Sequence, residues 1–266
     1  MQSCDPAVRS VARRLRLVNG RHVSLPAVAV CIPARNEAAT IGNIVTEVAE
    51  LVEQGVVADL VVVDDNSSDA TGAIAREAGA RVVRSGAGPG KGQALQQAVA
   101  ATDADVLVFL DADVVNFSAG YVTALTATLL ADPARKLVKA SYRRPLNGQP
   151  EEGGRVTELV ARPLLAQLFP ELATISQPLA GECALTRDLA ERVDFDDGYG
   201  IEIGLLIDTH LAYGRNAIAE VELVGERIHR NRPLRELTVH AREVLAAVLA
   251  RAGTAMPELA ELRSGP

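Results

Sequence analysis

The stretch VLVFLDAD, residues 106–113, decides the fold class of this chain of 266 residues. Its first five residues are all apolar, and a short continuous apolar run predicts a strand buried on both faces, as in parallel sheets covered by helices. Asp111 and Asp113 follow this run directly. In an open parallel sheet the ligand lies beyond the carboxyl ends of the strands. The stretch therefore indicates an α/β fold with an acidic site at one strand end.

The chain before this strand alternates between short apolar runs and segments with helical spacing of apolar residues. We expect strands at 27–32, 60–63, 81–83 and 106–110, and helices at 37–52, 68–78, 90–101 and 119–130. Ser68 is expected to cap the second of these helices. Strand–helix alternation with short links predicts a mainly parallel central sheet with helices on both faces.

The second half of the chain is less regular. We expect strands at 137–142, 183–186 and 217–224, and helices at 156–168, 201–213 and 234–252. Pro163 should kink the first of these helices. Residues 1–24 are predicted to form a peripheral arm. Because no repeat or low-complexity linker divides the sequence, we expect a single domain over residues 1–266.

Three polar segments follow strands of the expected sheet, namely Pro33–Glu37, Asp64–Asp69 and Asp111–Asp113. Since the carboxyl ends of parallel strands share one edge, these segments should converge on one site. Asp111 and Asp113 can share a hard cation such as Mg²⁺ or Mn²⁺, which keeps positions open for phosphate oxygens. Aspartate also commonly ends strands, so the triplet gains its meaning from the apolar strand before it.

The glycine-rich segment GPGKG, residues 88–92, resembles a phosphate loop but does not match one. Ser85 occupies the position of the first glycine, and Gly92 rather than Ser or Thr follows Lys91. The first strand likewise lacks the GxGxxG of dinucleotide-binding folds. A glycine-rich loop at a helix start can still bring N–H groups and Lys91 to a phosphate, although an ordinary turn is the alternative.

Composition excludes several classes of protein. The net charge is −7, aromatic residues make up 3% and there is no Trp, which argues against a nucleic-acid partner. Local basic clusters at 143–144 and 227–235 suit a small anionic ligand, or a solvated basic face. Three cysteines without CxxC spacing argue against a disulfide framework or zinc cluster. No apolar run reaches bilayer length and no leader pattern is visible, so we expect a cytoplasmic protein without a membrane partner.

The sequence also resembles a known family. The strings VAVCIPARNEAATI (28–41), VVVDDNSSDAT (61–71), GPGKGQAL (88–95) and VFLDADV (108–114) resemble the core of GT-A glycosyltransferases. The later strings LVKASYRRPL (137–146), GGRVTELVARPLL (153–165), QPLAGE (177–182), GYGIEIGLLIDT (198–209) and HRNRPL (229–234) resemble the retaining glucosyl-3-phosphoglycerate synthases. The resemblance covers about residues 27–253, with a nucleotide-binding half at 25–135 and an acceptor-binding half at 136–253.

The resemblance implies roles for individual residues. The implied nucleotide-sugar-binding residues are Pro33, Ala34, Glu37, Asp65, Lys91, Ala112, Leu179 and Glu202. The implied metal ligands are Asp111, Asp113 and His229, and the catalytic residues are Asp111, Asp113 and Glu202. The implied acceptor-binding residues are Gly154, Arg155, Thr157, Tyr199 and Asn231. Asp65 departs from the family, which usually has a small Ser there, and an additional carboxylate near the base could alter donor preference.

What the resemblance implies for activity is a metal-dependent hexosyl transfer. The donor would be UDP-glucose or GDP-glucose, the acceptor the 2-hydroxyl of 3-phospho-D-glycerate, and the enzyme a homodimer. Three alternatives stay open: a mannosyl-3-phosphoglycerate synthase or relative with another phosphorylated acceptor, a nucleotidyltransferase, and a catalytically silent nucleotide-sugar-binding protein. In a nucleotidyltransferase the Gly-Lys element should follow the first strand, whereas here it follows the third.

Overall fold

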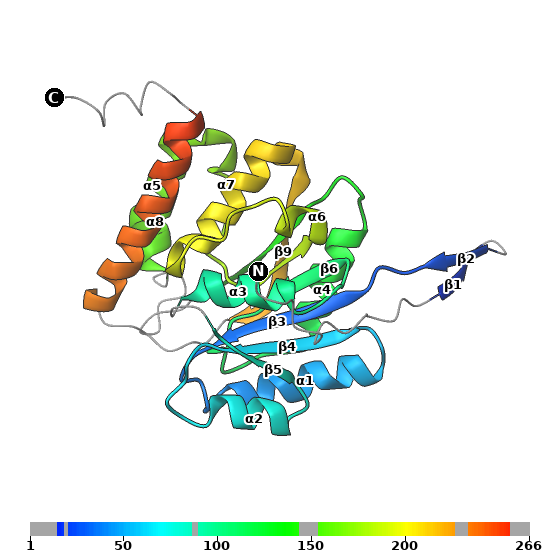
Figure 1. Cartoon of the computed structure of the whole chain (residues 1–266). Helices are drawn as coiled ribbons and strands as arrows, with labels where there is room; N and C mark the ends of the chain where they lie inside the picture. The colour runs from blue at the N-terminus through cyan, green and yellow to red at the C-terminus, as the bar shows by residue number, and fades with distance from the viewer. Residues whose placement is uncertain (1–14, 19–20, 87–89, 144–153, 227–233, 256–266) are drawn as a thin grey trace, which may run out of the picture.

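A seven-stranded sheet forms the centre of the molecule, with strand order β5-β4-β3-β6-β8-β7-β9 (Figure 1). The computed structural model describes residues 15–18, 21–86, 90–143, 154–226 and 234–255. The strands are β3 (Val28–Ala34), β4 (Asp59–Asp64), β5 (Arg81–Arg84), β6 (Val106–Phe109), β7 (Leu137–Arg143), β8 (Cys183–Thr186) and β9 (Ile218–Glu226).

The sheet is mainly parallel, as the sequence predicted. The pairs β3–β4, β4–β5, β3–β6 and β7–β9 are parallel, and only β8 runs antiparallel to its neighbours β6 and β7. Four adjacent parallel strands, β5, β4, β3 and β6, therefore end at one edge, and β4, β3 and β6 are the three in its middle. The polar segments expected to converge follow these three strands.

Helices cover both faces of the sheet. The apolar core on one face includes residues of α1 (Ile41–Glu53), α2 (Thr71–Glu77) and α4 (Gly120–Leu130). The core on the other face includes residues of α3 (Lys91–Ala100), α5 (Arg162–Leu168), α6 (Arg187–Ala190), α7 (Ile201–Tyr213) and α8 (Leu234–Ala255). Near the N-terminus, β1 (Leu15–Val18) and β2 (Arg21–Ser24) form an antiparallel hairpin away from the main sheet, so the expected arm is a hairpin (Figure 1).

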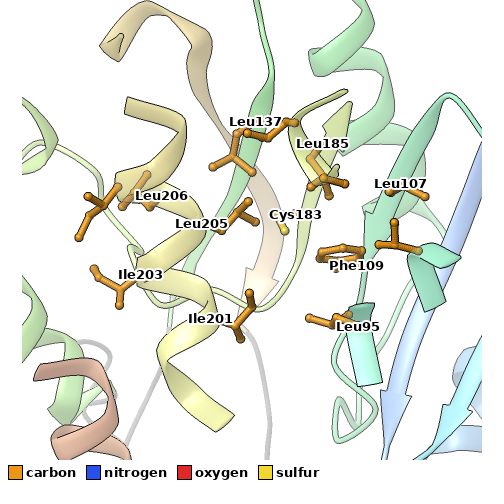
Figure 2. Close-up of a cluster of buried hydrophobic side chains, with 14 of the residues drawn as sticks. Leu95, Leu107, Phe109, Leu137, Cys183, Leu185, Ile201, Ile203, Leu205 and Leu206 are labelled. Carbon is orange, nitrogen blue, oxygen red and sulfur yellow. The ribbon is translucent and has the colours of Figure 1, made fainter. Parts of the chain in front are cut away.

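The core on the α3 and α7 face is mostly aliphatic, as a chain without Trp requires. Figure 2 shows Phe109 of β6, Leu185 of β8 and Leu137 of β7 packed towards Leu205 of α7. All four side chains are at most 2% exposed. Replacing one such leucine by alanine typically costs about 2–5 kcal/mol of folding free energy. This packing joins the two halves of the chain beneath the strand ends.

One local prediction was wrong, and another helix differs from expectation only in its type of turn. Ser68 does not cap α2; its N–H and hydroxyl donate to Asn36 Oδ1, and α2 begins only at Thr71, whose N–H and hydroxyl donate to Asp69 Oδ1. The expected helix at 156–168 opens as a π-helix over Thr157–Ala161 and continues as α5. Pro163 is the second residue of α5 and lies two positions after the π-helix, and the kink expected there stays a prediction.

Within the described parts of the chain, no helix combines the length and the apolar character that a bilayer-crossing helix needs.

Candidate functional site

A pocket of about 330 Å³ lies where β3, β4 and β6 end. Ligand pockets for small molecules are commonly of this size or larger. The described residues that line it are Pro33, Ala34, Arg35, Glu37, Asp65, Gly90, Lys91, Ala94, Asp111, Ala112, Asp113, Gly198, Tyr199 and Glu243. The convergence of the three polar segments is thus confirmed. Gly198, Tyr199 and Glu243, from the second half of the chain, line another side of the pocket.

The turn after β3 is held by the loop after β4. Asn36 adopts a left-handed conformation with φ 55°, which asparagine tolerates better than most residues. Its N–H donates to Ser67 Oγ at 3.1 Å, and the Glu37 N–H donates to Thr71 Oγ1 at 2.8 Å. These bonds fix the backbone of Pro33–Glu37 against the segment that carries Asp65.

Asp65 is a buried carboxylate in the pocket wall, 5% exposed. Its Oδ2 accepts the Gly90 N–H at 3.0 Å and so ties the glycine-rich segment to β4. Its Oδ1 is buried and has no hydrogen-bond partner among the described residues. A buried carboxylate oxygen without a donor is costly, so this atom is suited to accept a hydrogen bond from a ligand.

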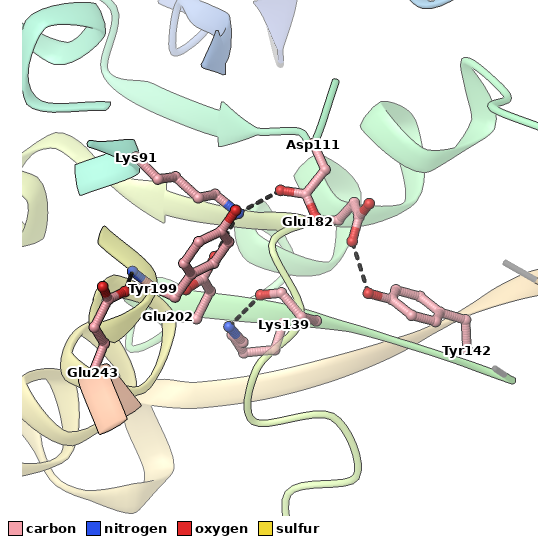
Figure 3. Close-up of polar contacts among 9 residues, drawn as sticks. Lys91, Asp111, Lys139, Tyr142, Glu182, Tyr199, Glu202 and Glu243 are labelled. Atoms are coloured by element: carbon pink, nitrogen blue, oxygen red, sulfur yellow. Dashed lines mark hydrogen bonds and ion pairs between the residues drawn. The ribbon is translucent and has the colours of Figure 1, made fainter. Parts of the chain in front are cut away.

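Lys91, at the start of α3, connects the two halves of the site (Figure 3). Its Nζ donates to Asp111 Oδ1 at 2.5 Å and also to Glu202 Oε1 of α7. Burial lowers the pKa of Lys91, but the two carboxylates more than offset this effect and hold the pKa well above its ordinary value. Lys91 therefore stays cationic and neutralises the two carboxylates, of which Glu202 is buried and Asp111 partly exposed.

Asp111 is packed against the backbone of Gly181. A Cβ at position 181 would lie 2.5 Å from Asp111 Cγ, so only glycine leaves the carboxylate in its place. The loop around Gly181 is in turn held by β7: Lys139 Nζ donates to the Ala180 carbonyl at 2.6 Å, and Tyr142 Oη donates to Glu182 Oε2 at 2.9 Å (Figure 3). Lys139 and Glu182 are fully buried, and burial lowers the pKa of Lys139.

The donor set at the strand end fits a divalent metal ion. Asp111 and Asp113 both line the pocket and offer the hard oxygen ligands that Mg²⁺ and Mn²⁺ prefer. The pairing of Asp111 with Lys91 indicates that this position requires a positive charge. In the described chain no three His, Cys, Asp or Glu side chains are grouped to hold a metal. The third implied ligand, His229, lies outside the described residues.

The structure brings most of the implied donor residues together, and fewer of the acceptor residues. Glu202 is not among the described residues that line the pocket but reaches it through Lys91, and Leu179 is half-buried against the core. Gly154, with φ 80°, and Arg155 are half-buried just before the π-helix, whose first residue Thr157 is 2% exposed, and none of the three is among the described residues that line the pocket. Asn231 lies outside the described residues. Of the implied acceptor residues, Tyr199 lines the pocket.

Sequence reasoning missed several residues of the site. Glu243 of α8 lines the pocket although a glutamate on a long helix resembles a solvated residue. Gly181 and Lys139 act on the pocket indirectly, through packing and a backbone hydrogen bond. A lysine inside the apolar stretch LVKA was the one sequence signal that could have indicated a buried polar contact in β7.

Comparison with known proteins gives consistent relatives. Residues 29–156 match the family described as Glycosyl transferase family 2. The glucosyl-3-phosphoglycerate synthase of Mycolicibacterium paratuberculosis is 47% identical over 240 residues, which is 85% of this chain and 72% of that protein. A crystal structure of the Mycobacterium tuberculosis glucosyl-3-phosphoglycerate synthase with Mn²⁺, UDP-glucose and phosphoglyceric acid matches with TM-score 0.80 and 45% identity over 86% of this chain and 80% of that chain. Another, with Mg²⁺ and UDP, matches with TM-score 0.80, 46% identity and the same coverage.

Proposed function

The chain belongs to the glucosyl-3-phosphoglycerate synthase family, and on this basis we propose that it transfers glucose from UDP-glucose to the 2-hydroxyl of 3-phospho-D-glycerate with retention of the α-configuration. One observation carries the proposal: a relative's structure with UDP-glucose and phosphoglyceric acid matches 86% of this chain at 45% identity. The pocket that joins Lys91, Asp111 and Asp113 at the strand ends supports it.

The donor's nucleotide is assigned to the pocket walls from β3 and β4. Pro33, Ala34 and Glu37 would contact the base and ribose, and Ala112 and Lys91 the diphosphate. The Oδ1 of Asp65 would accept an N–H from the base, which uracil offers at N3. GDP-glucose stays the alternative donor because guanine also presents N–H donors to a carboxylate.

Asp111 and Asp113 would hold Mg²⁺ or Mn²⁺, with His229 as the third ligand. When bound, the metal ion supplies Lewis-acid neutralisation of the departing diphosphate. Lys91 contributes a second positive charge at the same place, since its raised pKa keeps it protonated at neutral pH. This pairing of charges suits a leaving group that gains negative charge as the glycosidic bond breaks.

The acceptor is assigned to Gly154, Arg155 and Thr157 for its phosphate, with Tyr199 and Asn231 nearby. The protein has a net charge of −7, so a phosphorylated and carboxylated acceptor needs a local positive region. The Arg155 guanidinium can make two parallel hydrogen bonds to phosphate oxygens. Leu179 would offer its backbone near the sugar, on the same loop as Gly181.

Retention is assigned to attack on the front face of the sugar. Asp111 and Glu202 both accept hydrogen bonds from Lys91, and a carboxylate held in a charge-assisted bond is a poor nucleophile. The bond from C1 to the diphosphate oxygen would break as the bond from C1 to the acceptor's 2-oxygen forms. The acceptor's hydroxyl proton would pass to the departing phosphate oxygen. Glu202 would stay in its hydrogen bond with Lys91 during this step.

A grid of donors and acceptors tests this function, with released nucleoside diphosphate as the readout. UDP-glucose with 3-phosphoglycerate and Mg²⁺ should give the largest kcat/KM, and chelator should abolish turnover. Turnover only with GDP-mannose, or only with another phosphorylated acceptor, would refute the substrate assignment. Tight ATP binding without binding of UDP-sugars would instead indicate a nucleotidyltransferase.

We also propose that the enzyme is a cytoplasmic homodimer built from one domain over residues 1–266. Cys31 and Cys183 are buried and form no disulfide with each other, as expected for a protein of a reducing compartment. Burial raises the pKa of Cys31 to about 12 and that of Cys183 to about 11, so neither thiol is activated for catalysis. The dimer rests on the family resemblance, and sedimentation equilibrium would measure it.

A further inference from the structure

We propose that Glu243 of α8 is a positioning residue of the site, which holds Tyr199 through its backbone and adds a negative charge that weakens binding of the anionic acceptor. The kinetic part of this inference rests on the proposed function, whereas the structural part does not. Glu243 lines the same pocket as Lys91 and Asp111, yet it comes from a helix that begins more than 120 residues later in the chain.

Glu243 contacts the short turn that carries Tyr199. Its Oε2 accepts the Tyr199 N–H at 2.8 Å (Figure 3). The neighbouring Gly198 has φ 72°, and a Cβ there would lie 2.5 Å from Glu243 Oε2. Glycine is therefore required at 198 for two reasons, its backbone conformation and the approach of the carboxylate. The turn and the carboxylate fit each other as one unit.

The contact belongs to a continuous stripe along α8. His240, Glu243, Ala247 and Arg251 are spaced by three, four and four residues, so they lie on one face of the helix. The His240 ring stacks on the Tyr199 ring with centroids 3.5 Å apart, and a Cβ at position 200 would lie 3.0 Å from Ala247 Cβ.

The end of this stripe fixes the segment just before the turn. Arg251 Nη1 donates to Asp196 Oδ1 at 3.1 Å, and its Nε and Nη2 donate to the two carboxylate oxygens of Asp208 in α7, each at 2.7 Å. Three elements, the turn, α7 and α8, are therefore tied together by one arginine.

The other side of the same segment is held by α3. Gln93 Nε2 donates to Asp197 Oδ1 at 2.9 Å, and a Cβ at Gly92 would lie 2.9 Å from the Asp196 carbonyl carbon. Residues 196–200 thus lie between α3, which begins with Lys91, and α8. Because α7 starts directly after this segment, its position also determines where Glu202 meets Lys91.

The charge of Glu243 opposes the ligands of this pocket. Donor and acceptor are both anionic under the proposed function, and a carboxylate in the wall repels them. Its hydrogen bond to Tyr199, by contrast, needs only an acceptor oxygen. Glutamine keeps such an oxygen and removes the charge, and alanine removes both. The two effects of Glu243 can therefore be separated by these two substitutions.

The experiment compares Glu243→Ala and Glu243→Gln with wild type, and uses Arg242→Ala, an exposed neighbour on α8, as the matched control. Hydrogen exchange of the peptide that contains Tyr199 is measured by mass spectrometry without ligands. Steady-state kinetics give kcat and the KM of donor and acceptor separately. Thermal melts verify that each variant is folded.

Glu243→Ala should speed exchange at Tyr199 by about tenfold and lower kcat/KM for the acceptor by a similar factor, because a hydrogen bond to a charged group is lost. Glu243→Gln should keep the exchange protection and lower the KM of the acceptor severalfold, with Arg242→Ala matching wild type. The positioning role would be overturned if Glu243→Ala exchanges at the wild-type rate, or if both variants lose exchange protection and kcat/KM for the acceptor to the same extent. If wild type fails to turn over 3-phosphoglycerate, the proposed function falls while the exchange result still decides the structural claim.

Discussion

Replacing Gly181 by alanine is the sharpest test of how the acidic end of β6 is built. The added Cβ would lie 2.5 Å from Asp111 Cγ, whereas non-bonded carbons normally approach to about 3.5 Å. The Asp111 carboxylate must therefore move by roughly 1 Å, away from the position in which it accepts a hydrogen bond from Lys91. The φ of Gly181 lies outside the left-handed region that disfavours alanine, so the substitution adds no such backbone strain.

A displacement of this size should reduce the rate of catalysis strongly and lower the stability of the fold only moderately. A misplacement of about 1 Å can cost about 100-fold in rate, or about 2.7 kcal/mol of transition-state stabilisation. Overpacking of this kind typically lowers the free energy of unfolding by about 1–3 kcal/mol. We expect Gly181→Ala to lose about 100-fold in kcat/KM and to bind Mn²⁺ more weakly, while it still folds.

The assays are release of UDP for turnover and the paramagnetic resonance signal of free Mn²⁺ for metal binding. Gly120→Ala is the control, because the nearest atom to its added Cβ, Ser118 Oγ, lies at an ordinary 3.4 Å. If Gly181→Ala matches this control in both turnover and Mn²⁺ affinity, the steric argument is refuted and Asp111 does not depend on a glycine behind it.

Three further predictions concern single residues. Lys91→Met should lower the free energy of unfolding in chelator by roughly 3 kcal/mol, because the buried Glu202 and the partly buried Asp111 lose their cation. Mn²⁺ should restore part of the lost stability. The pKa of Lys91 in the folded protein lies above its ordinary value, so its contribution to stability is fully present at any pH below that ordinary value. Urea titrations should therefore give the same difference in unfolding free energy between wild type and Lys91→Met from about pH 7 to about pH 9. Arg155→Ala should raise the acceptor's KM about tenfold and leave donor binding unchanged, and the reverse pattern would misplace the acceptor site. Asp65→Ala should weaken UDP-glucose binding about tenfold in calorimetry, and unchanged affinity would contradict a contact to the base.

The fold was largely predictable because its main signals are local. The apolar runs at 28–34 and 106–109 form buried strands, and the periodic segment at 201–213 forms α7 as predicted. Local competition explains the failed cap: Ser68 bonds to Asn36 across two loops instead of capping α2. The π-helix before Pro163 is a detail that no periodicity indicates. The reversed direction of β8 also depends on partners distant in sequence.

The candidate site was predictable where its residues follow strands. Asp111 and Asp113 could be assigned from their own segment, and their pocket is present. The bond between Lys91 and Glu202 could not be predicted, because it joins residues 111 positions apart. Glu243 was missed because an i, i+3, i+7 stripe with polar members resembles a solvated face until its partner, the 196–200 segment, is known.

The most direct test of the central claim is the structure of the product made from UDP-glucose and 3-phosphoglycerate in Mg²⁺. Proton and carbon magnetic resonance of that product reports both the linkage and the anomeric configuration. We expect one glucose joined to the 2-oxygen of 3-phosphoglycerate, with the small anomeric coupling of an α-linkage. A large diaxial coupling, linkage through another oxygen, or hydrolysis of UDP-glucose without a glycosylated product would contradict it.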